Sequence, residues 1–196
     1  MVYSCGTNEF KQLGHLGGSN KALSPKQVNL GKRLKGKTVK QIECSRFHVV
    51  LLTSTGEVFT FGLNAGQLGH PNERVENATS YNNTICYITE PRLITQLNEP
   101  DLKIEIIACS DGVTLALQQS KNILYIFNDY KCKRLFYIKE TNSQIKKLRV
   151  YGGKLDNQSN PELKFIEDMG DPLVIVALTD SNLLYIWRGI LFLIDK

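Results

Sequence analysis

The sequence lacks the features that would indicate secretion, a membrane span or a metal site. No apolar run approaches the roughly 20 residues that a membrane-spanning helix needs. The N-terminal residues show no basic region followed by an apolar one, so we expect no cleavable signal. The five cysteines form an odd, irregularly spaced set without a Cys-x-x-Cys pair, which argues against a disulfide framework and against zinc. We therefore expect an intracellular protein, located in the cytoplasm and also in the nucleus.

Strong charge and helical periodicity are also missing. The 24 basic and 19 acidic residues give a formal net charge of +5, a mild excess that does not indicate a nucleic-acid binder. No stretch of 11 residues or more has a convincing helical period. The apolar segments are instead short, rich in Val, Ile, Leu, Tyr and Phe, and bounded by Gly, Asn, Ser and Pro. This pattern predicts an all-β fold.

The chain contains an internal repeat. Residues 2–8, Val-Tyr-Ser-Cys-Gly-Thr-Asn, reappear as residues 58–64, Val-Phe-Thr-Phe-Gly-Leu-Asn. Each copy is followed by Gln-Leu-Gly-His, which ends at His15 and at His70. A more divergent third copy pairs residues 122–127 with residues 182–187. Repeats of this length with several short strands are typical of propeller blades. We expect one incomplete propeller spanning residues 1–196, with units of approximately 2–57, 58–123 and 124–196.

The turns between paired strands also recur. Gly56, Asn122 and Asn182 hold the same place in the three units, each between two apolar strands. Gly and Asn tolerate the positive φ that tight hairpins require. We therefore predict a hairpin turn at each of these positions.

These motifs resemble the repeats of the regulator of chromosome condensation family. The resemblance rests on the two Gly-x-Asn…Gln-Leu-Gly-His strings and on Cys44-Ser-x-x-His48 with its following Thr55-Gly56 turn. It covers residues 2–127 well and the remainder only in pattern. It implies a partial β-propeller of about three blades. Family propellers close with about seven blades, so we expect further blades in cis.

The resemblance also implies function. It is strongest to family scaffolds that combine ankyrin, propeller and BTB regions, which implies a protein partner such as a tyrosine kinase or a cullin ubiquitin ligase assembly. We expect a non-catalytic protein-interaction module without a cofactor. Two long insertions, residues 71–90 and 152–171, are the natural contact elements. The alternative function is guanine-nucleotide exchange on a small GTPase of the Ran type, which rests on fold-level analogy alone.

A phosphate-loop pattern occurs once. Residues 31–38, Gly-Lys-Arg-Leu-Lys-Gly-Lys-Thr, match it letter for letter, but the pattern also needs a buried strand before it and a helix after it. The residues that follow, 39–53, read as two strands instead. We interpret this segment as a basic, solvated loop between strands, and an ATP- or GTP-binding enzyme as the weaker hypothesis.

The histidines and carboxylates are interpreted as structural. His15 and His70 hold equivalent positions, which favours side chains that pin a turn by hydrogen bonds. His48 gives way to Val113 and Val174 in the other units, which favours packing. Three carboxylates near residue 170 fit no calcium-binding loop and indicate a solvated segment: Glu167, Asp168 and Asp171.

The cysteines are also interpreted as structural. Cys44 and Cys109 are equivalent and flanked by apolar residues, and Cys5 aligns with Phe61, so all three are expected in the core. Cys86 and Cys132 lie in less regular segments and are the only thiols expected to be exposed. We predict no catalytic, cofactor-binding or metal-ligating residue, and no particular partner-binding residue can be named from the sequence.

Overall fold

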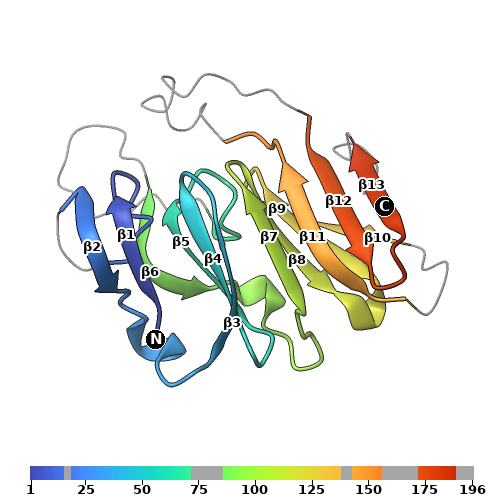
Figure 1. Cartoon of the computed structure of the whole chain (residues 1–196), viewed down its shortest axis with the longest axis horizontal. Coiled ribbons are helices and arrows are strands. Elements are labelled where there is room, and N and C mark those ends of the chain that lie inside the picture. The colour runs from blue at the N-terminus through green and yellow to red at the C-terminus, as the bar shows by residue number, and fades with distance from the viewer. Residues whose placement is uncertain (16–18, 72–85, 138–142, 156–171, 189–196) are drawn as a thin grey trace.

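The structure, a computed structural model, describes residues 1–15, 19–71, 86–137, 143–155 and 172–188. Within these residues all strands are antiparallel to their neighbours and form four sheets that stand side by side in chain order (Figure 1). The predicted all-β architecture is confirmed.

The four sheets are unequal in size. The first has two strands and the last has three, whereas the second and third have four each. In chain order the first sheet comprises β1 (Tyr3–Thr7) and β2 (Lys21–Gln27); the second β3 (Val39–Cys44), β4 (His48–Thr53), β5 (Val58–Leu63) and β6 (Tyr87–Leu93); the third β7 (Ile106–Ser110), β8 (Val113–Gln118), β9 (Ile123–Asn128) and β10 (Lys131–Phe136); and the fourth β11 (Ile145–Tyr151), β12 (Val174–Thr179) and β13 (Leu184–Arg188). The described helices are single turns, namely α1 (Gly31–Leu34), η1 (Thr95–Leu97) and η2 (Gln119–Lys121).

Sheets and repeat units do not coincide. The unit 2–57 supplies β1 and β2 to the first sheet, and it supplies β3 and β4 to the second. The unit 58–123 likewise completes the second sheet with β5 and β6 and begins the third with β7 and β8. Each four-stranded sheet is therefore built by two successive units. The unit boundaries themselves stay a prediction.

Three apolar layers hold neighbouring sheets together. Between the first and second sheets, Val2 and Val28 pack with Phe59 and Phe61. The second and third sheets share a layer with Val50, Leu52, Ile107 and Phe127, and the third and fourth share one with Leu115, Ile126, Leu148 and Ile175. Because β5, β8 and β9 lie between two such layers, every residue of these strands is buried. This explains why their sequences are continuous apolar runs instead of alternating ones.

The predicted hairpin turns are confirmed. Gly56 has φ +93°, Asn122 has φ +55° and Asn182 has φ +63°. Glycine is also required at position 56 by space, because a Cβ there would lie 2.5 Å from Lys103 Cγ. Asn122 and Asn182 reach the left-handed region that asparagine tolerates better than most residues.

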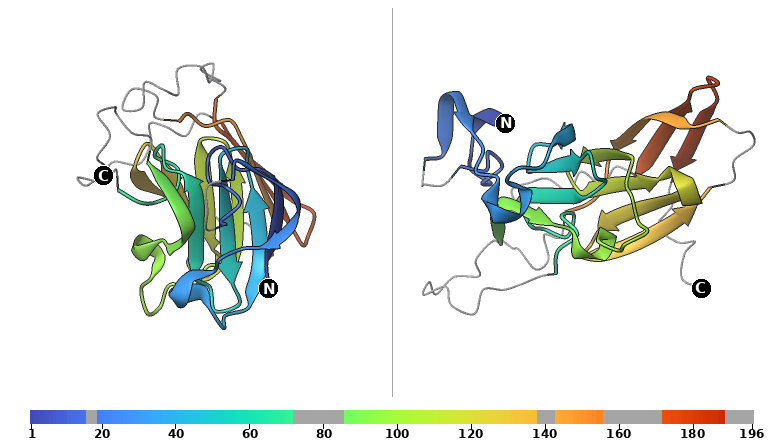
Figure 2. Two further views of the ribbon diagram at one scale, coloured as in Figure 1. Left: turned by 90° about the vertical axis from the view of Figure 1, so that its left-hand side faces the viewer. Right: turned by 90° about the horizontal axis from the view of Figure 1, so that it is seen from below.

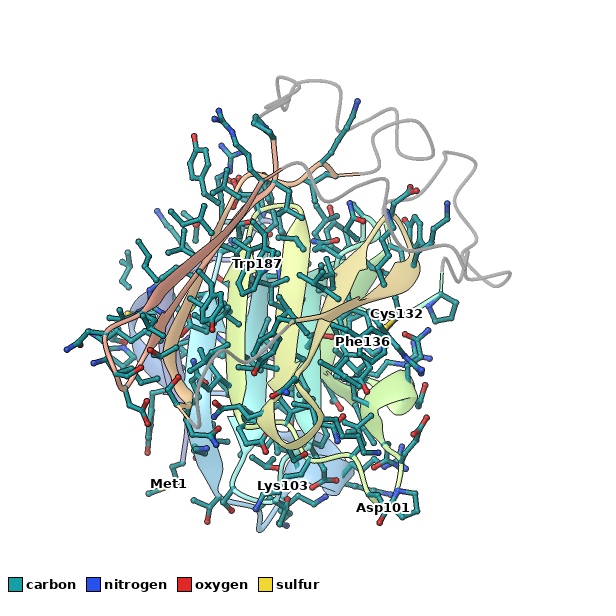
Figure 3. All side chains as sticks on the ribbon, turned by 90° about the vertical axis from the view of Figure 1, so that its right-hand side faces the viewer. Met1, Asp101, Lys103, Cys132, Phe136 and Trp187 are labelled. Carbon is teal, nitrogen blue, oxygen red and sulfur yellow. The ribbon has the colours of Figure 1, made fainter. Side chains whose placement is uncertain are left out.

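The connections between strands emerge on two opposite faces. One face, here called the loop face, carries the β1–β2, β3–β4, β5–β6, β7–β8, β9–β10 and β11–β12 connections. The other carries the three hairpin turns above and the linkers between sheets, with Asp101 and Lys103 (Figure 3). The first and last sheets lie at opposite ends of the molecule (Figure 2). Within the described ranges, no helix is long and apolar enough to cross a membrane.

Candidate protein-interaction surface

The repeated Leu-Gly-His motifs build two equivalent loop anchors. Ser4 Oγ donates to the Leu13 carbonyl at 2.6 Å and lies 2.9 Å from His15 Nε2. Thr60 Oγ1 donates to the Leu68 carbonyl at 2.7 Å and lies 3.0 Å from His70 Nε2. Since each hydroxyl proton goes to a carbonyl, the ring nitrogen is the donor to the hydroxyl oxygen. The predicted role of His15 and His70 in pinning these loops is confirmed.

The glycine of each motif permits close packing on the next sheet. A Cβ on Gly14 would lie 2.8 Å from the Phe61 ring, and a Cβ on Gly69 would lie 3.0 Å from the Phe127 ring. Phe61 and Phe127 occupy equivalent positions on β5 and β9. The loop of one sheet is thereby seated on an aromatic side chain of the following sheet, which fixes the loop face relative to the strands.

An apolar cluster lies at the centre of the loop face. Phe47, Leu63, Ala65 and Leu155 are buried together, and Phe10 packs against them. The Phe10 and Phe47 rings meet edge to face, with centroids 4.8 Å apart. These residues come from connections of the first, second and fourth sheets. The cluster therefore joins loops that are more than 100 residues apart in the chain.

Polar contacts tie the same loops together. The Arg46 backbone N–H donates to Asp111 Oδ1 at 3.0 Å, and Arg46 Nε lies 3.4 Å from Asp111 Oδ2. The Arg46 guanidinium also stacks over the Phe47 ring, 4.4 Å from its centroid. Tyr130 Oη donates to the Asn64 carbonyl at 3.2 Å. Arg46 remains exposed within this network, so it is available to a partner.

Both predicted contact insertions begin at this cluster. Asn64 Nδ2 donates to the Pro71 carbonyl at 3.1 Å, which holds the first residue of the 71–90 insertion beside Ala65. Leu155, a member of the cluster, lies near the start of the 152–171 insertion. The predicted end of the first insertion is wrong, because residues 87–90 belong to β6. Residues 72–85 and 156–171 lie outside the described part of the chain.

The sequence did not reveal this cluster. Phe10 aligns with Gly66, and Phe47 aligns with Gly112, so neither aromatic residue recurs in the next unit. A usable signal would have been a repeat position at which one unit has phenylalanine and the next has glycine. The glycines make close contacts of their own: a Cβ on Gly112 would lie 2.6 Å from the Gly153 backbone.

The phosphate-loop pattern forms no phosphate-binding fold. Residues 31–34 form the single turn α1, so the prediction of a plain loop is wrong there, and β3 follows directly. Lys37 forms an ion pair and hydrogen bond with Glu57 and lies 5.9 Å from the Phe59 ring centroid. Partial burial alone would raise the pKa of Glu57, but hydrogen bonds from Lys37 and Thr55 lower it overall. The lysine of the pattern is thus engaged within the chain.

His48 links the second and third sheets. Its Nδ1 lies 2.8 Å from Ser45 Oγ, and its Nε2 lies 2.9 Å from Thr114 Oγ1 on β8. Complete burial lowers the pKa of His48 to about 3, so the ring is neutral at physiological pH. The predicted packing role is confirmed, and the hydrogen bonds add a polar link between sheets.

The cysteine predictions were partly wrong. Cys5 and Cys44, expected in the core, are the exposed thiols, because no described strand covers their side of β1 and β3. Cys109 is partly buried against the layer between the second and third sheets, and its pKa is raised chiefly by that burial. Cys86 and Cys132 are half-buried instead of exposed, and burial raises the pKa of Cys132 to about 11.

The remaining site predictions are untested. The carboxylates Glu167, Asp168 and Asp171 lie outside the described residues. In the part of the chain that the structure covers, no three His, Cys, Asp or Glu side chains gather closely enough to hold a metal ion. The absence of catalytic and cofactor-binding residues stays a prediction.

Adjacent four-stranded antiparallel sheets, each completed by the following repeat unit, define an arc of a β-propeller, as predicted. The chain belongs to the regulator of chromosome condensation (RCC1) repeat family, whose models match residues 1–52, 55–117 and 39–67. The predicted family is confirmed.

The chain is also similar to individual family members. It is 33% identical over 189 residues to the inhibitor of Bruton tyrosine kinase of Mus musculus and 34% identical over 190 residues to that of Homo sapiens. These matches cover 96% of this chain and 13% of each relative, so the chain spans about an eighth of their length. The human E3 ubiquitin-protein ligase HERC2 is 35% identical over 121 residues, 61% of this chain and 2% of HERC2. The resemblance predicted from residues 59–70, 109–112 and 128–134 was to the inhibitor of Bruton tyrosine kinase, and it is confirmed.

Solved structures show the same fold at low sequence identity. Human WBSCR16 superposes with a TM-score of 0.61 at 20% identity, covering 95% of this chain and 42% of that one. Prp20p of Saccharomyces cerevisiae, described with its binding to Gsp1p and histones, superposes with a TM-score of 0.55 at 18% identity, covering 96% and 41%.

Proposed function

We propose that this chain is a non-catalytic protein-interaction module of an RCC1-repeat scaffold, and that it binds a protein kinase through its loop face. The observation that carries the proposal is the convergence of both long insertions on one preorganised cluster, formed by Phe10, Phe47, Leu63, Ala65 and Leu155. Binding surfaces of this kind consist of variable loops held by a rigid scaffold. The similarity to the inhibitor of Bruton tyrosine kinase over 96% of the chain supports a tyrosine kinase of the Bruton type as the partner.

Arg46 is the described residue best placed to contact that partner. It is exposed, it stacks on Phe47, and Asp111 fixes its backbone. Arginine and aromatic residues are enriched among the residues that contribute most to interface affinity. Charge reversal at this position removes a prealigned cation and adds repulsion to an acidic partner.

The test measures binding of purified Bruton tyrosine kinase to the immobilised chain by biolayer interferometry. Arg46→Glu is expected to weaken binding about tenfold, which corresponds to about 1.4 kcal/mol. Lys32→Glu on α1 at the opposite face is the matched control, since it makes the same charge change on an exposed lysine. Equal losses from both substitutions would refute the loop-face assignment. No binding by the parent chain at about 50 μM kinase would refute the kinase as partner.

A ubiquitin-ligase context is the second part of the proposal. The similarity to the inhibitor of Bruton tyrosine kinase and to HERC2 supports a role in presenting a substrate to a ligase in the cytoplasm or nucleus. We expect the chain to bind the substrate while other regions of a scaffold bind the cullin. Direct, saturable binding of a purified cullin to residues 1–196 would contradict this division. Nucleotide exchange on a Ran-type GTPase has only fold-level likeness in its favour, and we do not propose it.

A further inference from the structure

The first sheet lacks an inner half within the described residues. By the repeat, β1 corresponds to β5 and β2 to β6, so nothing in this sheet corresponds to β3 and β4. The strand β1 pairs with β2 alone, and its other edge is open. An open strand edge carries unpaired backbone groups that can accept another strand.

Equivalent residues on the next two sheets show what this absence uncovers. Ile42 on β3 and Ile107 on β7 are 65 positions apart and hold the same place in their units, as do Cys44 and Cys109. Ile107 is 0% exposed, because β3 and β4 cover it, whereas Ile42 is 45% exposed. Cys109 is partly buried and Cys44 is exposed. The side chains are identical, so only the missing strands explain the difference.

The covering strands also make a specific polar contact. Gln41 Oε1 on β3 accepts from the Ile107 backbone N–H at 3.0 Å, and Gln41 Nε2 donates to the Ile107 carbonyl at 2.8 Å. One amide side chain therefore satisfies both backbone groups of Ile107. Ile42 is the residue of β3 that corresponds to Ile107, and its neighbouring inner strand is the one that is missing.

We propose that the inner slot, formed by Ile42, Cys44 and the open edge of β1, binds a two-stranded antiparallel β-segment of another polypeptide. That segment has the chemistry of β3 and β4: apolar side chains toward Ile42 and Cys44, and a Gln or Asn whose amide meets the Ile42 backbone. Strand addition supplies backbone hydrogen bonds for affinity, and the amide and apolar positions supply specificity. A second copy of this chain has no spare pair, because each of its described strands already belongs to one of the four sheets. The inference names one class of partner for the protein-binding function proposed above.

The test uses the full chain and a synthetic peptide of residues 38–54 with Cys44→Ser as the probe. Binding is followed by the rate at which iodoacetamide alkylates individual thiols, read by mass spectrometry. At saturating peptide, Cys44 alkylation is expected to slow at least about tenfold, because the thiolate loses access to the reagent. Cys5 is the internal control: it aligns with Phe61, which faces away from the third sheet, so Cys5 faces away from the second sheet and outside the slot. Its rate is expected to stay unchanged.

Matched variants test the two chemical requirements. A peptide that also carries Gln41→Ala is expected to bind several-fold more weakly, since two backbone groups lose their partner. Ile42→Glu in the chain is expected to abolish protection. Phe136→Glu, at a residue 65% exposed on β10, makes the same kind of change outside the slot and is expected to preserve protection. Circular dichroism melting confirms that both chain variants fold.

The outcomes separate the possible occupants. Unchanged Cys44 alkylation at about 1 mM peptide overturns the proposal, since the isolated hairpin is only marginally ordered but would still bind measurably at that concentration. Equal protection of Cys44 and Cys5 also overturns it, because it indicates non-specific association. Protection that rises with the chain's own concentration, without peptide, identifies a second copy as the occupant instead. None of these results depends on the kinase, so failure here and failure of the loop-face proposal are distinguishable.

Discussion

The buried His48 makes a quantitative prediction about stability and pH. Its pKa in the folded chain is about 3, compared with 6.5 for an exposed histidine. Because the folded pKa is depressed, the unfolded chain takes up a proton below about pH 6.5 and the folded chain does not until about pH 3. The stability contribution is therefore fully present above pH 6.5 and is lost as the pH falls from 6.5 towards 3. Between pH 7.5 and 5.0 this residue alone should cost about 2 kcal/mol.

The assay is urea denaturation followed by circular dichroism at pH 7.5 and at pH 5.0. The reference variant is His48→Val, which places at this position the residue that the equivalent position 113 already carries. At pH 7.5 the variant is expected to lose about 2–4 kcal/mol, because Ser45 Oγ and Thr114 Oγ1 each lose a partner. Its further loss on going to pH 5.0 should be about 2 kcal/mol smaller than that of the parent chain. Equal pH dependence in the two proteins would refute the description of His48 as a buried neutral link.

Further predictions concern single glycine and lysine positions. Gly69→Ala should destabilise the chain by about 2–4 kcal/mol, because φ is +74° and the added Cβ meets Phe127. Gly36→Ala is its control: φ is +83° but nothing lies within 4 Å, so urea denaturation should show a loss of only about 1 kcal/mol. Lys37→Ala should lower stability by less than about 1 kcal/mol through loss of the Glu57 pair. Equilibrium dialysis should detect no ATP binding to parent or variant, and ATP binding that Lys37→Ala removes would contradict our interpretation of this segment.

The sequence predicted what repetition itself determines. The strands, the turns at Gly56, Asn122 and Asn182, and the loop-pinning histidines all follow from local chemistry that recurs in each unit. These features depend on neighbours close in the chain or at a fixed repeat distance. The hydrogen bonds from Ser4 to His15 and from Thr60 to His70 were predictable for that reason.

Repetition could not predict exposure at the ends of the arc or contacts between non-equivalent loops. Ile42 and Ile107 are the same residue at the same repeat position, yet one is bare and the other covered. Aligning Cys5 with Phe61 suggested a core residue for the same reason, and it is exposed. The cluster of Phe10, Phe47 and Leu155 depends on how the sheets turn relative to one another, which no single unit encodes.

The offset between repeat units and sheets has a consequence for synthesis on the ribosome. When the unit 2–57 has emerged, β3 and β4 are present but their partners β5 and β6 are not. The nascent chain therefore always ends in a half-built sheet, which waits for the next unit of roughly 60 residues, or about 3–12 s at typical elongation rates. During that interval the strand β4, apolar along its whole length, has a free edge and no covering layer. Chaperones that recognise extended apolar segments would meet this chain once per repeat, at the same stage each time.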